Sequence, residues 1–463
     1  MIHKKTCFII LITLLQCISV AQPNTKIGLK QAVDSAILNF PGLKSKQFEM
    51  AGANAYLSDA KHQRLPSLKL SDQIDYGTDN GLGGSYFPLG IVPSTSGGIR
   101  ADNNTNSFSG NIGVAYLEEE LYNFGLNAAR IASAKSLLKQ YKSDYDKTSF
   151  LLQYTIAQLY FEMLRYQLLL SIQKKNIARN MVLNSFVKAY TSSGIKPGVD
   201  SSLANAEVSK AKIEYLKTFD SYSTLKYRFL FLTGMRVNNI EIDTAVYTAS
   251  DAFIDQMSTK VSVDSVRASN PVLQYYNSQW EYSLSLEKTI RRSFMPKLNL
   301  MGAAWFRGSS INSKDVYGDA ASGLDYSRYN YMAGLSLSYN ITDVVHQHDK
   351  SAIQHFQSEA VHETLIQQQS LLANQLQEAD IAIQSAIARQ LEIPVQLKAA
   401  QEVYSQKLAQ YNAGLATITE LTDASYLLFK SETDKVESLS DLLHTLLQKA
   451  VTNNTLNAFI TSF

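Results

Sequence analysis

The chain carries PGLKSKQFEMAGANAYLSDAKHQRLP at residues 41–66 and PVLQYYNSQWEYSLSLEKTIRRSFMP at residues 271–296. Both segments begin and end on proline, and the two prolines are 25 residues apart in each. Val-Asp-Ser precedes the first proline by eight residues in both, at 33–35 and at 263–265. Agreement in spacing as well as in composition indicates an internal duplication, and such a repeat decides the fold before any single element does.

The duplication continues toward the end of each copy. The two proline-bounded segments are 230 residues apart in the sequence. Further along, equivalent positions of the two copies are 220 residues apart: Gly194 and Gly414, Asp200 and Glu420, and Ala204 and Ala424. We therefore predict two copies of one unit, each built as helix, strand, loop, strand, very long helix, tight turn and helix. The predicted parts are a first repeat at 22–234, a linker at 235–262, a second repeat at 263–450 and a tail at 451–463.

Composition and the first residues narrow the class of protein. The chain has 463 residues and a formal net charge of +2, which gives no reason to expect nucleic-acid binding. Residues 1–21 combine a basic start, an apolar core and a Ser-Val-Ala ending, which predicts a secretory signal peptide. A lipoprotein signal that uses Cys17 is the alternative. Because Cys7 and Cys17 are the only cysteines, the mature chain would hold no disulfide and no thiolate metal site.

Helical segments take up most of both repeats. Residues 29–65 predict a helix whose second part begins at Pro41, since proline suits the first turn of a helix. Residues 126–190 and 347–411 carry apolar and aromatic side chains at helical spacing, which predicts coiled-coil-like helices with water on more than one side. Pro394 lies inside the second of these helices, where we expect a kink or a local break.

A turn that contains glycine follows each long helix, at 191–198 and at 412–417. Glycine there permits the left-handed conformation that ends many helices. Return helices are predicted at 199–234 and 418–450. No stretch predicts a helix that crosses a membrane, because the most apolar one, Phe150–Ile172, is interrupted by charged and amide side chains.

Each repeat also holds two stretches in which apolar and polar side chains alternate. They lie at 68–77 and 108–117 in the first repeat and at 298–307 and 331–339 in the second, within hairpins at 67–118 and 297–341. The apolar faces predicted for them are Leu68, Leu70, Ile74 and Tyr76; Phe108, Ile112, Val114 and Tyr116; Leu298, Leu300, Ala304 and Phe306; and Tyr331, Ala333, Leu335, Leu337 and Tyr339. Strands of about ten residues with one apolar face are typical of outer-membrane barrels. A soluble hairpin packed on a core is the alternative.

The number of strands has a consequence for assembly. Four strands leave two open edges, and an unpaired backbone group in lipid costs several kcal/mol. Other chains must therefore close the sheet, and three chains would give twelve strands, an even count in the range that barrels use. The sequence thus predicts a mainly α-helical chain whose four strands contribute to a shared 12-stranded transmembrane β-barrel in a homotrimer.

The repeat and its turn motifs resemble those of the TolC family of outer-membrane efflux and secretion channels, over nearly all of the mature chain. The family motif is glycine, an acid six residues on and alanine at the tenth, here Gly194, Asp200 and Ala204, and again Gly414, Glu420 and Ala424. The resemblance implies long helical hairpins that form a trimeric α-barrel in the periplasm, with the β-barrel in the outer membrane and residues 235–262 at the equator. The turns would be tips that dock a periplasmic adaptor and, through it, an inner-membrane pump. No cofactor is implied.

Two acids after the second turn are the main candidates for a gate. Glu420 and Asp423 are three residues apart on one helical face, so in a trimer each would form a ring of three carboxylates. The resemblance places the acidic constriction of the tunnel at these positions, and such rings favour cations and can close a pore. The alternative is local: Thr417 and Glu420 have the spacing of a capping box, and acids in a first turn favour the helix dipole.

The resemblance also implies a closing bond between Tyr411 and Asp200 across helices, whereas an ordinary tyrosine at a helix end is the alternative. Two departures weaken this match. Ala416 stands where the family has an arginine, and Val199 stands where a hydroxyl would help. The closing network must therefore differ from that of the family.

Two further groups of residues, histidine and aromatic, have a regular placement. His348, His355 and His362 are seven residues apart, about 10 Å along a helix, which is too far to share a metal ion, so solvated positions are predicted. Aromatic residues near the strand ends could form an interfacial girdle, with loop packing as the alternative: Tyr76, Phe87, Trp305, Phe306 and Tyr331.

The function that these patterns favour is a passive exit duct, the outer-membrane channel of a tripartite efflux or type I secretion system. A soluble periplasmic scaffold or adaptor is the alternative, and it would explain the long helices but not two amphipathic hairpins at equivalent places. No catalytic residues and no metal ligands are predicted, because no Ser–His–acid set, phosphate loop or metal-ligand spacing is present. The sequence does not indicate the cargo.

Overall fold

The computed structural model describes residues 25–81, 98–236, 240–243 and 269–462. The predicted signal peptide, Phe87 and most of the predicted linker lie outside these ranges. The chain divides into two compact units. A helical unit comprises residues 1–50, 141–277 and 363–463, and a sheet unit comprises residues 51–140 and 278–362.

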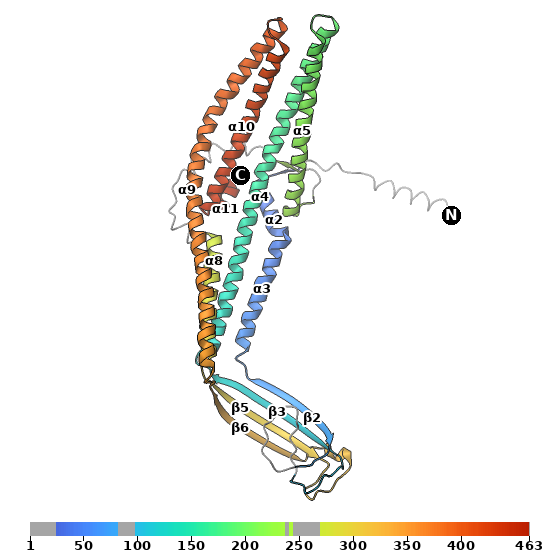
Figure 1. Cartoon of the computed structure of the whole chain (residues 1–463), viewed down its shortest axis with the longest axis vertical. Coiled ribbons are helices and arrows are strands. Elements are labelled where there is room, and N and C mark those ends of the chain that lie inside the picture. The colour runs from blue at the N-terminus through green and yellow to red at the C-terminus, as the bar shows by residue number, and fades with distance from the viewer. Residues whose placement is uncertain (1–24, 82–97, 237–239, 244–268, 463) are drawn as a thin grey trace, which may run out of the picture. The chain divides into compact units, whose positions relative to one another are not determined.

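Long helices dominate the described chain (Figure 1). The helices are α2 (Leu29–Asn39), α3 (Pro41–His62), α4 (Leu126–Ser192), α5 (Gly198–Thr233), α8 (Pro271–Ser293), α9 (Asp343–Asn412), α10 (Ile418–Thr452) and α11 (Leu456–Ser462), with the short 3-10 helix η1 (Ala320–Gly323). Pro41 opens α3, as the sequence predicts, and α2 ends two residues earlier, at Asn39. The break expected at Pro394 does not occur: α9 is continuous from Asp343 to Asn412. A proline removes one backbone hydrogen bond, and the remaining bonds of so long a helix continue on both sides of it.

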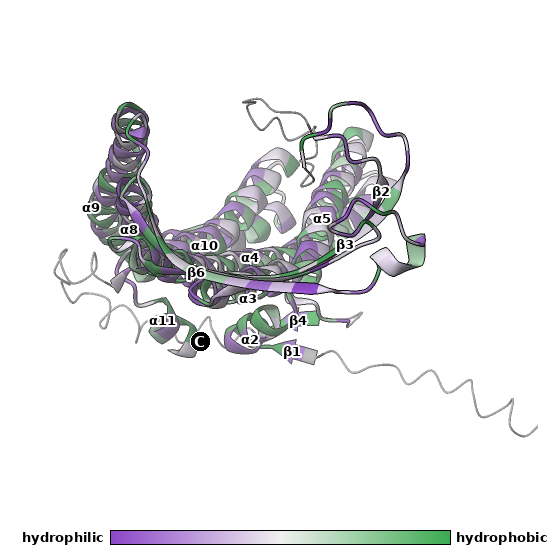
Figure 2. Ribbon diagram, turned by 90° about the horizontal axis from the view of Figure 1, so that it is seen from below, coloured by the Kyte–Doolittle hydropathy of each residue, from purple (hydrophilic) through white to green (hydrophobic). Residues whose placement is uncertain are grey.

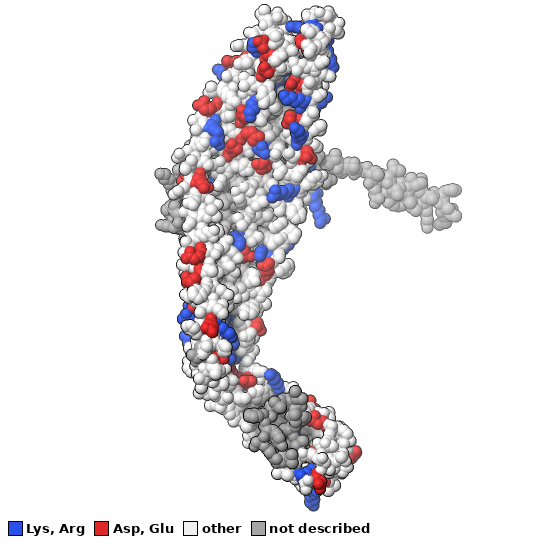
Figure 3. All heavy atoms as spheres, viewed as in Figure 1, with Lys and Arg blue, Asp and Glu red and all other residues white. Residues whose placement is uncertain are grey.

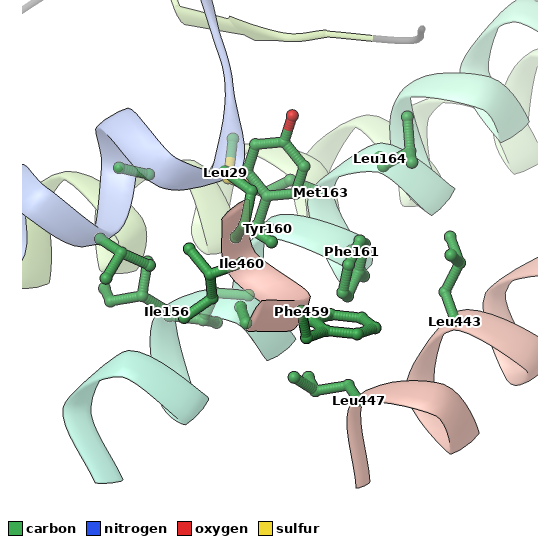
Figure 4. Packing of buried hydrophobic residues seen from close by; sticks show 14 of the residues in the cluster. Leu29, Ile156, Tyr160, Phe161, Met163, Leu164, Leu443, Leu447, Phe459 and Ile460 are labelled. Atoms are coloured by element: carbon green, nitrogen blue, oxygen red, sulfur yellow. The ribbon is translucent and has the colours of Figure 1, made fainter. Parts of the chain in front are cut away.

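The core of the helical unit is a layer of side chains between α4, α10, α2 and α11 (Figure 4). Tyr160 and Phe161 of α4 are fully buried, and the Phe161 ring lies edge-on to that of Phe459 at 5.9 Å. The hydroxyl of Tyr160 donates to the carbonyl of Ile27, at 3.1 Å. This bond ties the first strand of the chain to the core. Burying aromatic side chains of this size stabilises the unit by about 1.5–3 kcal/mol for each.

Three elements of this core, α11, β4 (Ile240–Ile242) and β1 (Thr25–Ile27), are absent from the sequence predictions. The predicted tail forms α11, which buries Leu456, Phe459 and Ile460. The linker expected to be irregular contains β4, which pairs in parallel with β1. Strands of three residues are too short to show a period of two, and the two partners are more than 200 residues apart in sequence.

Charged side chains of both signs are interspersed along the helices (Figure 3). One group joins α4 to α10: Arg165 lies 2.8 Å from Glu162 and 3.0 Å from Glu437. Nε2 of His444 lies 3.1 Å from the other oxygen of Glu162. These partners, His444 first and Arg165 after it, lower the pKa of Glu162 to about 2. The carboxylate is therefore ionised at neutral pH.

The sheet unit contains one antiparallel sheet of four strands in the order β2-β3-β5-β6. The strands are β2 (Ser67–Gly77), β3 (Phe108–Tyr122), β5 (Lys297–Ser309) and β6 (Arg328–Ser338). Strands from the two repeats are thus neighbours, because β3 of the first pairs with β5 of the second. The sheet is curved, and β2 and β6 are its open edges (Figure 2).

The register decides which side chains share a face, because directly opposed residues point to the same side. One side, called here the apolar face, carries Leu68, Leu70, Ala115, Leu117, Leu298, Leu300, Ala304, Leu335 and Leu337. The prediction for β3 was wrong: Tyr116 opposes Lys69 and Val114 opposes Ser71, so both lie on the opposite face. β3 has apolar residues on both faces. Alternation within one strand does not show which of these residues share a face with the apolar residues of the neighbouring strand.

None of the helices in the described ranges has a stretch long and apolar enough to cross a membrane.

Candidate functional site

The candidate site is the pair of glycine turns that end α4 and α9, which lie at the same end of the helical unit (Figure 1). Gly194 and Gly414 have φ angles of +74° and +77°. In each turn the residue after the glycine donates to the carbonyl five positions back, Ile195 to Tyr190 and Leu415 to Gln410, at 2.9 and 2.8 Å. This is the Schellman pattern, which requires a left-handed residue and therefore favours glycine. The two repeats build their turns in the same way.

The helices that leave the turns begin differently. At the start of α10, Thr417 accepts a hydrogen bond from the backbone of Glu420, and the Glu420 carboxylate accepts one from the backbone of Thr417. This is the predicted capping box, and it satisfies two backbone donors of the first turn. α5 begins after Pro197 with no side-chain cap, and Asp200 is the acid of its first turn. The start of α10 is thus fixed by two capping bonds that the start of α5 lacks.

A buried cluster lies behind the two turns and draws on all four helices. Its buried members are Leu183 and Val187 of α4, Ala204 of α5, Tyr411 of α9, Ala416 at the second turn, and Ile418 and Leu421 of α10. Ala204 is 2% exposed and Ala424 is 4% exposed, so both alanines of the motif face inward in the single chain. Their small side chains let the helices approach each other closely, and the turns themselves form the exposed surface.

Tyr411 carries a polar hydroxyl group into this apolar cluster. It is buried, and its hydroxyl has no hydrogen-bond partner within the described part of the chain. Burial, followed by the nearby charge of Asp200, raises the pKa of Tyr411. The ammonium group of Lys196 lies 5.1 Å from the centre of its ring. The structure therefore brings Tyr411 and Asp200 near each other, but no hydrogen bond joins them in this chain.

The two candidate gate acids are exposed on α10. Glu420 forms the capping box and also lies 3.7 Å from the ammonium group of Lys407, which is four residues before Tyr411. An ion pair this exposed contributes about 0–1 kcal/mol. Lys196 and Lys407 were missed in the sequence analysis. The spacing of Lys407 and Tyr411, one helical turn, was the only available signal, and it does not reveal a contact with another helix.

Apolar side chains at the turns are unusually open to solvent. Ile195 is 65% exposed, Val199 is 71% exposed and Leu415 is 79% exposed. Ile195 and Leu415 each follow the glycine of their turn directly. The two tips therefore present apolar residues at equivalent positions. The space beside each glycine is open, since nothing lies within 4 Å of a Cβ built on it.

The remaining candidates behave as follows. No group of three or more metal-ligating side chains occurs within the described residues. His348 and His355 are exposed, as predicted, whereas His362 stacks on Trp280 with ring centres 4.3 Å apart. The proposed aromatic girdle is divided by the register, because Trp305 lies on the face opposite to that of Phe306.

Comparisons with known proteins agree on one fold. Residues 263–448 match the family model described as outer membrane efflux protein. No curated protein sequence matches the chain. Among solved structures, the outer membrane protein VceC of Vibrio cholerae is 14% identical, with a TM-score of 0.71 over 92% of this chain and 95% of VceC. The CmeC outer membrane channel of Campylobacter jejuni is 13% identical, with a TM-score of 0.76 over 92% of this chain and 85% of CmeC.

The MtrE outer membrane channel of Neisseria gonorrhoeae, in its open state, is 14% identical, with a TM-score of 0.70 over 92% of this chain and 89% of MtrE. At such identities the likeness shows the fold alone. The chain therefore shares the fold of these channels across both repeats.

Proposed function

We propose that this chain, whose residues 263–448 match the family model described as outer membrane efflux protein, is the exit duct of a tripartite efflux or type I secretion system. Three copies would enclose a polar lumen, and cargo would cross the outer membrane through it without energy from the duct itself. A soluble scaffold is not favoured, because it would leave the apolar face of the sheet in water.

The sheet is the observation that carries this proposal. Leu70 on one edge strand is 77% exposed and Leu335 on the other is 67% exposed, and both lie on the apolar face. An exposed apolar face together with two unpaired edges is unstable in water and in lipid alike. Pairing β2 of one copy with β6 of the next removes both edges, and three copies give a closed barrel of twelve strands whose apolar face meets lipid.

Exposed apolar side chains on the helical unit support the same assembly. On α5 they include Ile213, Leu216 and Phe231, and on α9 they include Ile381, Leu391 and Val395. A ring built by rotation needs two different complementary surfaces on each copy. We assign one to α5 and the other to α9, so that the long hairpins form an α-barrel in the periplasm.

The gate would lie at the tips. In a trimer, Glu420 and Asp423 would form rings of carboxylates that favour cations and narrow the opening. The capping box does not compete with this role, because the Glu420 side chain that accepts the backbone hydrogen bond is also exposed. Tyr411 and Asp200 would form the closing contact, and Lys196 and Lys407 supply the positive charge that the family places at the position of Ala416.

The exposed tips would dock a periplasmic adaptor that connects the duct to an inner-membrane pump. Gly194 and Gly414 hold the turn backbone open, Ile195 and Leu415 offer apolar contacts, and the alanines of the motif support the turns from inside. Selectivity for cargo would reside mainly in the pump.

The test is electrical. Purified mature protein, reconstituted into a planar lipid bilayer, is expected to give discrete, ohmic current steps with a preference for cations over anions. The proposal would be contradicted if the protein were not associated with a membrane from which detergent extracts it, and if it added no conductance to the bilayer. Heat-denatured protein at the same concentration is the control for detergent artefacts.

A further inference from the structure

The apolar face of the sheet is divided into two parts. Its half nearer the helices carries bare aliphatic side chains: Leu68, Leu70, Leu117, Leu300, Leu335 and Leu337. On the central strands β3 and β5, its other half is covered by the chain's own loop between β5 and β6, residues 310–327, called here the β5–β6 loop; Ser109, Asn111 and Gly308 are buried there. We infer that this loop is an external shelf, which meets the headgroup layer of the outer leaflet and sets where the hydrocarbon layer ends on this protein.

The covered half is built to receive the loop. Three of its positions are polar, and each one binds the loop. Asp72 on β2 accepts a hydrogen bond from the hydroxyl of Tyr326, at 2.8 Å. The Asn111 side chain donates to the carbonyl of Leu324, at 3.0 Å, and the Ser109 hydroxyl donates to the carbonyl of Ala320.

Glycines on the same face make room for these contacts. A Cβ at Gly113 would lie 2.7 Å from the hydroxyl oxygen of Tyr326, and one at Gly308 would lie 2.7 Å from the carbonyl oxygen of Gly323. Real Cβ atoms essentially never approach so closely. At Gly308 the neighbour is backbone, so the loop fits there only because the position is glycine, whereas at Gly113 a Cβ would displace the end of the Tyr326 side chain. Phe306 completes the seat, since its ring centre lies 5.8 Å from that of Tyr326.

Register places the whole seat on the apolar face. Asp72 opposes Gly113, and Gly113 opposes Phe306. The row of Leu70, two residues closer to the helices, is bare. On β3 and β5 the change from bare side chains to side chains that contact the loop thus falls within two residues, whereas Ile74 on β2 and Tyr329 on β6 remain exposed.

Hydrocarbon and this loop cannot occupy the same surface. The loop has a 3-10 turn and irregular backbone, and backbone of this kind is excluded from direct contact with lipid tails. Tyr326, which contacts Phe306, is of the residue type that collects at the membrane–water interface. The bare half must therefore hold the acyl chains, and the shelf must lie above them.

The dimensions agree with this assignment. From Leu298 to Phe306, β5 advances roughly 27 Å, or about 20 Å along the membrane normal once the strand is tilted as barrel strands are. The apolar band of an outer-membrane barrel is about 25 Å tall. Ile74 and Tyr76 lie beyond the shelf row on β2, at the edge where a neighbouring copy would add its β6.

Spin labels test the inference, which rests on the proposed barrel. Because Cys7 and Cys17 lie in the predicted signal peptide, the mature chain accepts single cysteines without further change. The variants are Leu335→Cys in the bare half, Ser322→Cys in the loop and Met332→Cys on the opposite face, each labelled in lipid vesicles of phosphatidylcholine. Collisions with dissolved oxygen report lipid, and collisions with a water-soluble nickel chelate report water.

We expect the label at 335 to lose contact with nickel and to keep contact with oxygen, while the labels at 322 and 332 keep contact with nickel. A label at 322 that loses nickel while 335 remains in lipid would overturn the shelf and leave the barrel intact. Nickel contact at both 335 and 332 would overturn the barrel itself. Nickel contact at 335 together with its loss at 332 would mean that the loop lies in the lumen, which also overturns the shelf.

The anchor is tested separately. Asp72→Ala removes the acceptor of Tyr326 and is expected to raise the mobility of the label at 322. Asp75→Ala is the matched control, because it removes an exposed aspartate of the same strand on the opposite face. Equal mobility in the two variants would overturn the role of Asp72.

Discussion

Gly194→Val combined with Gly414→Val is expected to abolish export, so that the variant matches a deletion strain, while the variant still forms trimers. Both glycines have positive φ angles, and a left-handed residue with a Cβ costs roughly 1–2 kcal/mol. Restoring an allowed backbone at valine would distort both turns and displace Ile195 and Leu415, which form the exposed surface of the tips. A loss of about 1.4 kcal/mol in docking is already a tenfold weaker complex.

The measurement is growth of the source bacterium under a toxic compound whose tolerance is lost when the gene is deleted. Gly198→Val is the matched control. Gly198 lies only four residues from Gly194, but it has no positive φ and open space around it, so the change should preserve tolerance. Full tolerance in the double variant would show that the tips do not dock the adaptor. Equal losses of tolerance in the double variant and in Gly198→Val would show that the turn conformation is not the cause.

Glu420→Gln combined with Asp423→Asn is expected to raise the conductance of the reconstituted channel and to reduce its preference for cations. In a trimer the change removes six carboxylates from the narrow end of the duct, together with the partner of Lys407. The field that attracts cations falls, and one of the contacts that holds the tip is lost. Single-channel current and reversal potential in a salt gradient measure the two effects.

The amide variants separate charge from helix capping, because glutamine can replace glutamate in a capping box. Thr417→Ala provides the opposite case: it removes the cap, at a cost of about 1 kcal/mol, and keeps both charges. Selectivity should change in the amide variant and remain in Thr417→Ala. If the amide variant conducts and selects like the wild type, the two acids do not form the gate.

Features that depend on local backbone requirements could be predicted from the sequence. Pro41 fixes the start of a helix, and Gly194 and Gly414 supply a conformation that few other residues adopt. The ends of α4 and α9 lie within two residues and one residue of the predicted ones, since the glycine turns mark them. The order of the remaining helices and strands was predictable from the duplication, because each element has an equivalent in the other repeat.

Contacts between distant segments could not be predicted in the same way. Alternation in β3 could not reveal that Val114 and Tyr116 lie away from the apolar face, because pairing with β2 decides the side. Lys196 reaches the ring of Tyr411 across 215 positions of sequence, and no local pattern links them. The capping box of Glu420 was predictable because both partners lie within one helical turn.

If identical chains share one barrel wall, the particle extracted from the membrane must contain several copies of the chain. Native mass spectrometry of the mature protein, released from detergent micelles, is expected to give three copies, with no second component required for the complex to persist. A particle that remains a single chain under the mildest extraction would leave the edges of β2 and β6 unpaired in lipid. That result would contradict a barrel shared by three chains.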